Sequence, residues 1–321
     1  MHSPKKWFLL TCICLALTLV SQFFIFRYPA IYNLCLKSYL YNHHWWVEKP
    51  AKHLVLGSSN AMNAIIPSRI SQLRAKGNQY SLNLGLNGTT PFHMHHNLTQ
   101  YAKKFPFPNE VDIVITPLML TEYLYYKLDY EKIWLKKEQW NLLEKNEGIT
   151  NSYFFPAMLF YENLHFDHLK IFKEYHFNLN QTRSNRGFQP ISEGVFKKED
   201  LSENFPHISQ GFSWAHQQIN YLKKIKELAN QHNTQIRYIL TPLHQDLYNY
   251  YLTHKHTLQE LDRLLKETLG DINYLGSFDP QKFKLEEKHF INPDHLTVNG
   301  ARLFTNSTYG QHPITSKFII E

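Results

Sequence analysis

A serine near the start of the chain and a histidine near its end are the residues that could do chemistry. Ser59 ends an apolar run in residues 54–60 (LVLGSSN), and His295 lies in residues 292–296 (NPDHL). A serine hydroxyl becomes a nucleophile when a base removes its proton, and histidine is the commonest such base. Taken singly, Ser59 could equally cap a helix, and His295 could be a surface residue. The pair indicates nucleophilic catalysis only if the fold brings the two side chains together.

A glycine-containing turn could supply the groups that hold a developing oxyanion. Residues 83–88 (NLGLNG) follow a second apolar run. The backbone N–H of Gly88, next to that of Ser59, would make an oxyanion hole with two donors. Asn87 could add a side-chain donor, or it could simply shape the turn. The competing interpretation of this segment is an ordinary glycine turn.

The elements that must position these residues alternate between strands and helices. The apolar patterns predict strands over residues 53–56, 80–84, 111–115, 235–240 and 272–275. They predict helices over residues 63–76, 91–104, 212–231, 257–269 and 298–307. Such alternation predicts an α/β fold: a three-layer α/β/α sandwich, flavodoxin-like, with a central parallel five-stranded sheet. Reactive groups in such folds lie at the carboxyl ends of strands, and the residues found there are Ser59, Gly88, Thr116, His244 and Asp279.

The N-terminus differs in kind from the rest of the chain. Residues 7–26 carry no charge, a length that suits one transmembrane helix, and the lysines just before them favour a cytoplasmic N-terminus. A cleaved signal peptide and a buried core helix are the alternatives. We therefore expect a membrane anchor at 1–27 and a linker at 28–52. The domain at 53–321 would face the periplasm or the cell exterior, with an irregular insertion at about 120–210.

Composition narrows the partners and cofactors. The formal net charge is +7, but lysine and arginine are scattered and form no basic stripe, so we expect no nucleic-acid partner. All cysteines lie before residue 36, which excludes a disulfide or a cysteine-based zinc site in the domain. His93, His95 and His96 have no evident carboxylate beside them, so we expect no metal and no cofactor.

Three short segments together resemble the SGNH/GDSL hydrolase superfamily. Residues 57–59 (GSS) resemble its first block, Gly-Asp-Ser, and residues 83–88 resemble its second block, with the oxyanion glycine at Gly88. Residues 292–295 (NPDH) resemble its last block, Asp-x-x-His. The chain looks most like the membrane-anchored, DltD-like envelope branch. The resemblance implies an SGNH fold over residues 53–310, with Ser59 as nucleophile and His295 as base.

Two departures from the family pattern bear on the site. Thr116 stands where the third block carries an oxyanion-binding asparagine, and Asn292 stands where the last block carries aspartate. An amide can hold the imidazole tautomer, so Asn292 is the first candidate to orient His295. Asp294 is less favoured, because neighbouring side chains on an extended segment point apart. Asp279 is another candidate.

These features predict a membrane-anchored, extracytoplasmic serine esterase or acyltransferase. Its substrates would be ester-linked acyl groups of an envelope polysaccharide or lipid, and His244 or Thr116 could contact them. The expected partners are the cytoplasmic (inner) membrane, through residues 7–26, and a membrane acyltransferase. The alternative from a different class is a catalytically degenerate SGNH-fold module that binds or assembles envelope machinery, which the changes at Asn292 and Thr116 would favour.

Overall fold

The part of the chain that carries the predicted strands is described by a computed structural model. It describes residues 47–74, 80–86, 89–121, 183–192, 196, 200–209 and 215–318, all within a unit formed by Leu40–Asp129 and Asn178–Glu321. The predicted anchor at 1–27, the linker up to residue 46 and most of the 120–210 insertion lie outside these residues. Within the described ranges, no helix combines the length and the apolar character needed to cross a membrane.

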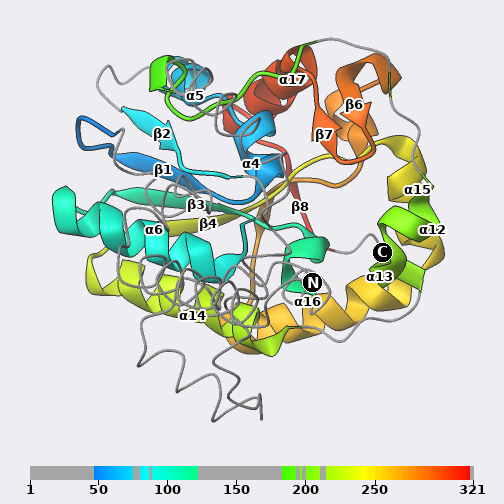
Figure 1. Cartoon of the computed structure of the whole chain (residues 1–321), viewed down its shortest axis with the longest axis horizontal. Helices are drawn as coiled ribbons and strands as arrows, with labels where there is room; N and C mark the ends of the chain where they lie inside the picture. Colours follow the sequence, from blue (N-terminus) through cyan, green and yellow to red (C-terminus); the bar gives the residue numbers. More distant parts are fainter. Residues whose placement is uncertain are drawn as a thin grey trace, which may run out of the picture. The chain divides into compact units, whose positions relative to one another are not determined.

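A six-stranded sheet forms the centre of the fold, in the order β2-β1-β3-β4-β5-β8 (Figure 1). Its strands are β1 (His53–Leu56), β2 (Ser81–Asn83), β3 (Glu110–Val114), β4 (Gln235–Leu240), β5 (Tyr274–Gly276) and β8 (Thr315–Ser316). The first five run parallel, at the predicted places. The predicted strand number was wrong by one, since β8 adds an antiparallel edge strand beside β5. Strand β8 has only two residues, which are too few to show the alternation of apolar and polar residues that marks a strand in sequence.

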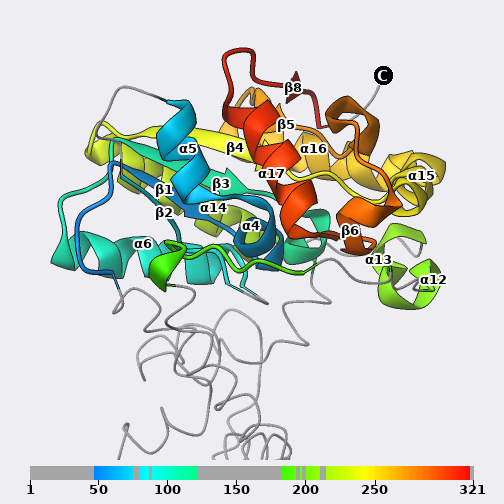
Figure 2. The same ribbon diagram turned by 90° about the horizontal axis from the view of Figure 1, so that it is seen from above.

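Apolar side chains alternate between the two faces of the sheet. Leu54 and Leu56 belong to one core, whereas Val55 belongs to the other. The first face is covered by α6 (Pro91–Lys104), α14 (His216–Gln231) and α16 (Lys255–Leu269). The second is covered by α4 (Ser59–Ala64), α5 (Pro67–Leu73) and α17 (Val298–Tyr309) (Figures 1 and 2). Strands buried on both sides explain why apolar residues in β1 and β3 are consecutive rather than strictly alternating with polar ones.

The helices differ from the predicted ones in two places. The predicted helix over 63–76 is instead two helices, α4 and α5, separated at Ile65 and Ile66. Pro67 is the first residue of α5, and it lacks the N–H that would continue α4. A further helix, α15 (Gln245–Thr253), was not predicted. The shorter elements are η2 (Pro117–Leu120), α12 (Leu201–Asn204), α13 (Pro206–Ser209), η3 (Pro280–Phe283), η4 (Glu287–His289), β6 (Phe290–Asn292) and β7 (His295–Leu296).

A buried ionic network links neighbouring strands of the sheet. Asp112 Oδ2 lies 2.8 Å from His53 Nε2 and accepts the Tyr309 hydroxyl at 2.6 Å. Arg237 Nε donates to Asp112 Oδ1 at 2.7 Å. Burial opposes ionisation of Asp112, but the charges of His53 and Arg237 and their hydrogen bonds outweigh it and lower the Asp112 pKa. The carboxylate is thus ionised and joins β1, β3, β4 and α17.

The variant Asp112→Asn is expected to lower the free energy of unfolding by about 3–5 kcal/mol at pH 7, because it leaves buried charge without its partner. Since folding lowers the Asp112 pKa, this stabilisation is complete above the unfolded pKa of about 4 and is lost as the pH falls below it. Urea denaturation of both proteins at pH 7 and pH 3 measures the difference. The exposed control Asp271→Asn should change stability by less than about 0.5 kcal/mol. Equal losses in the two variants would contradict this role.

Candidate active site

Ser59 stands at a sharp turn between a central strand and a helix. It is the first residue of α4 and is partly exposed, three residues after β1 ends. Gly57 makes the turn possible. A Cβ there would lie 2.5 Å from Ala61 Cβ and 2.9 Å from Val114 Cβ, closer than real atoms approach. Only glycine therefore lets α4 start this close to β3, at the carboxyl edge of the sheet.

His295 is carried by a tight hairpin. Strands β6 and β7 pair antiparallel, with Asn292 opposite His295 and Pro293-Asp294 as the turn between them. Asn292 Oδ1 accepts the backbone N–H of His295 at 2.9 Å and that of Asp294 at 3.3 Å. Such bonds from an asparagine side chain to the backbone that follows it stabilise a turn. Asn292 thus fixes the loop that presents the imidazole.

The fold brings Ser59 and His295 together. Ser59 Oγ lies 2.8 Å from His295 Nε2, although the two residues are 236 positions apart in the chain. This distance lies within the range for proton transfer between a nucleophile and its base. The His295 side chain keeps 19% of its surface exposed, so the pair is open to a ligand.

The other ring nitrogen of His295 faces a carboxylate. Nδ1 lies 2.6 Å from Asp294 Oδ1 and 3.0 Å from Asn292 Oδ1. The expectation that Asp294 points away from His295 was therefore wrong. It assumed an extended segment, but Asp294 occupies a turn, whose curvature carries its side chain beside the ring. With the Nδ1 proton shared between these oxygens, Nε2 is left to accept a proton from Ser59.

A chain of hydrogen bonds ties the serine turn to the histidine hairpin. Asn60 Nδ2 donates to the backbone oxygen of Asp294 at 2.6 Å, and Ser58 Oγ donates to Asn60 Oδ1 at 3.0 Å. Both Ser58 and Asn60 are buried. From the other side, the backbone N–H of His244 donates to Pro293 O at 2.8 Å. Sequence reasoning missed Asn60, whose only signal was its place directly after Ser59.

Asn60 is expected to act on activity by positioning. Asn60→Ala should lower kcat/KM for a small ester by about 10-fold, because sub-ångström displacement of His295 from Ser59 is costly. The matched control is Asn63→Ala, which removes a buried asparagine of the same helix that bonds Gln189 O instead. Steady-state kinetics on both variants, with thermal unfolding alongside, separates positioning from stability. Equal losses of activity in both would refute the assignment.

The remaining predicted site residues either make no side-chain hydrogen bond to Ser59 or His295 or lie outside the described residues. Thr116 precedes η2, and Asp279 Oδ1 accepts Gln281 N–H at 2.9 Å to cap η3. Among the described residues, neither side chain has a hydrogen bond to Ser59 or His295. His244 caps α15, where its Nδ1 accepts Asp246 N–H at 3.3 Å. Burial lowers the His244 pKa against the opposing charges of nearby carboxylates, which favours its neutral form.

The proposed oxyanion loop is held close to the serine turn at both ends. Asn87 and Gly88 themselves lie outside the described residues. On either side of them, Leu86 N–H donates to Gly57 O at 3.1 Å, and Thr89 Oγ1 donates to the same oxygen at 2.7 Å. Gly57 is two residues before Ser59. Leu86 and Thr89, the residues on either side of Asn87 and Gly88, are thus bonded to the serine turn. The oxyanion role of Gly88 and Asn87 stays a prediction.

A second serine–histidine–aspartate series exists, but it is buried away from solvent. Ser81 Oγ lies 3.1 Å from His53 Nδ1, and His53 Nε2 contacts Asp112. All three side chains are almost completely buried. No substrate can reach them, so this series is part of the core. Among the described residues, no three potential metal ligands gather at one place.

Comparisons with known proteins add little to this geometry. Neither a scan against protein-family models nor a search of curated proteins gave a match. Among solved structures, the chain is similar to one described as "a putative platelet activating factor from Streptococcus pneumonia". The identity is 10%, the TM-score is 0.38, and the match covers 91% of this chain and 96% of that chain. At these values the likeness carries no argument about function, which depends on the site itself.

Proposed function

We propose that this protein is a serine esterase or acyltransferase of the SGNH type, with Ser59 as nucleophile and His295 as general base. The observation that carries the proposal is the 2.8 Å contact between Ser59 Oγ and His295 Nε2. A carboxylate on the far ring nitrogen and partial exposure of the pair support it. Hydroxyl, imidazole and carboxylate in series are the arrangement that nucleophilic acyl transfer requires.

The proposed reaction uses the contacts of the Ser59–His295 pair. Ser59 Oγ attacks the acyl carbonyl while its proton passes to His295 Nε2, and Asp294 stabilises the imidazolium that forms. The tetrahedral intermediate collapses, the C–O bond to the alcohol breaks, and His295 returns the proton to the leaving oxygen. The acyl group is then on Ser59 Oγ. Water, or the hydroxyl of an acceptor sugar, gives its proton to His295 and releases the acyl group by the same steps in reverse.

The oxyanion requires backbone donors. Ser59 is the first residue of α4, so its N–H has no acceptor within the helix. Gly88 N–H is the second donor in this proposal, and the Asn87 side chain could be a third. Loss of one such donor typically costs about 10²–10³ in rate.

A catalytically silent binding module was the alternative function. It drew support from Asn292 and Thr116, which stand where an aspartate and an oxyanion-binding asparagine were expected. The Asp294 carboxylate, 2.6 Å from His295 Nδ1, supplies the missing charge from a different position. This contact favours an active enzyme over a silent module.

The proposed setting is the cell envelope. We infer an N-terminal anchor in the cytoplasmic membrane through residues 7–26, with the α/β domain on the far side of the membrane. The proposed substrates are ester-linked acyl groups of an envelope polysaccharide or lipid, and a membrane acyltransferase is the proposed partner. An uncharged run of this length after two lysines supports this arrangement.

Acetate release from an O-acetylated polysaccharide tests the function. The full-length protein is expected to release acetate, or to move acetyl groups to an added sugar acceptor, faster than Ser59→Ala. The variant Ser202→Ala, at an exposed position in α12, is the matched control and should behave like the wild type. Identical release by the wild type and Ser59→Ala, on this polymer and on p-nitrophenyl acetate, would end the proposal.

A further inference from the structure

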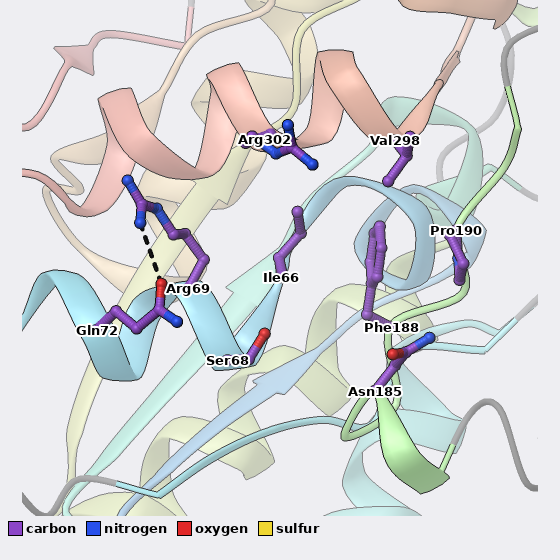
Figure 3. A pocket seen from close by; sticks show the side chains of 9 residues that line it. All are labelled: Ile66, Ser68, Arg69, Gln72, Asn185, Phe188, Pro190, Val298 and Arg302. Atoms are coloured by element: carbon purple, nitrogen blue, oxygen red, sulfur yellow. Dashed lines mark hydrogen bonds between the residues drawn. The ribbon is translucent and has the colours of Figure 1, made fainter.

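A cavity of about 500 Å³ lies beside α5 and α17, separate from the Ser59–His295 pair (Figure 3). Two helices and one irregular segment form its walls. Ser68, Arg69 and Gln72 come from α5, Val298 and Arg302 from α17, and the rest from the segment 185–190 and Ile66. Neither Ser59 nor His295 lines the cavity, and no step proposed above uses it.

Two arginines from different helices give the cavity a positive wall. None of the nine lining residues is acidic. Arg69 is fixed by neutral acceptors, since its Nε donates to Asn306 Oδ1 at 2.7 Å and its Nη1 to Gln72 Oε1 at 3.0 Å. Arg302 has no hydrogen bond or ion pair with any residue that the structure describes. Guanidinium donors without a carboxylate partner are suited to carboxylate or phosphate oxygens.

The rest of the lining is mixed in a way that suits a sugar. Ser68, Gln72 and Asn185 present hydroxyl and amide groups that can bond sugar hydroxyls. Pro190 lies across from α5 and provides apolar contact, with Phe188, which is buried in the core, beside it (Figure 3). Apolar walls with a few fixed polar groups are typical of small-molecule sites. An anionic sugar unit satisfies all three features: charge, hydroxyl partners and apolar faces.

Short elements connect the cavity to the reactive pair. Ile66 lies two residues after α4, the six-residue helix that starts at Ser59. Val298 lies three residues after His295 and donates its N–H to Ile191 O at 2.9 Å. The cavity is therefore bordered by the segments that lead directly to Ser59 and His295.

We propose that this α5–α17 pocket binds an anionic sugar unit of the substrate, with Arg69 and Arg302 binding its carboxylate or phosphate. The assignment of that sugar to the acylated substrate rests on the proposed function. The binding itself does not require Ser59, so the two proposals can fail separately.

Titration of the full-length protein with glucuronate, glucose 6-phosphate and glucose, followed by calorimetry, tests the pocket. At least one anionic sugar is expected to bind about 10-fold or more tightly than glucose, and Arg302→Gln should remove this preference. Arg302→Lys, which keeps the charge, should retain part of it. The control Arg263→Gln removes an exposed arginine from α16, against the opposite face of the sheet, and should bind like the wild type. Preference for glucuronate identifies a carboxylate ligand, and preference for glucose 6-phosphate a phosphate.

Three results would contradict the proposed pocket. Glucose could bind as tightly as the anionic sugars, Arg302→Gln and Arg263→Gln could lose the same affinity for them, or neither anionic sugar could bind at about 10 mM. Hydrolysis of p-nitrophenyl acetate by the wild type tests the proposed function separately, because this ester carries no sugar. Loss of the pocket would leave that hydrolysis intact. If the proposed function is wrong, the wild type should not hydrolyse this ester, whereas its sugar binding should be unchanged.

Discussion

Replacing His295 with glutamine is expected to lower kcat/KM for p-nitrophenyl acetate by about 10⁴-fold. The imidazole is the only described group within hydrogen-bond distance of Ser59 Oγ that can take its proton at neutral pH. Without it the hydroxyl stays protonated and attacks poorly. Ser59→Ala should cause a loss of similar size, and the double variant should lose little more, because residues that act as one unit are not additive.

Steady-state hydrolysis by the three variants measures this coupling. His256→Gln, at an exposed position in α16, is the matched control and should retain wild-type activity. Multiplied losses in the double variant would show that the two side chains work independently, which contradicts a nucleophile–base pair.

The second large effect is expected at Asp294. Asp294→Asn should lower kcat by about 100-fold with little change in KM, because the amide cannot stabilise the imidazolium that forms when His295 takes the proton. The side chain of Asp294 keeps 18% of its surface exposed, so solvent reduces its effect below that of a fully buried aspartate.

Asn292 is the residue to compare with Asp294. Its side-chain oxygen lies 3.0 Å from the same Nδ1 atom and also holds the hairpin backbone. We expect Asn292→Ala to cost about 10-fold in kcat and to lower the unfolding temperature, since its effect is on loop geometry. If Asn292→Ala lost more activity than Asp294→Asn, the amide would be the orienting group, as the sequence had suggested.

Much of the fold was predictable because buried parallel strands are rich in apolar residues. The five parallel strands overlap the five predicted segments, and α6 matches its predicted bounds from Pro91 to Lys104. The split between α4 and α5 at Pro67 was also readable from sequence and was missed. Strand β8 was not predictable, because it exists only through its contact with β5.

The sequence predicted which serine and histidine form the site, but it did not predict the contacts that orient them. Ser59 and His295 were found because each follows a strand or precedes a helix in a short motif. The role of Asp294 depends on a two-residue turn between β6 and β7, strands too short to show alternation. Asn60 acts through a backbone oxygen 234 residues away, and no local pattern marks such a contact.

The most direct test of the central claim, that Ser59 is a nucleophile activated by His295, is covalent labelling with a fluorophosphonate followed by peptide mass mapping. We expect a single adduct on the peptide that contains Ser59. Labelling should be strongly slowed in His295→Gln and absent in Ser59→Ala. An adduct on another residue, or equal labelling of the wild type and Ser59→Ala, would contradict the assignment of this pair as the reactive centre.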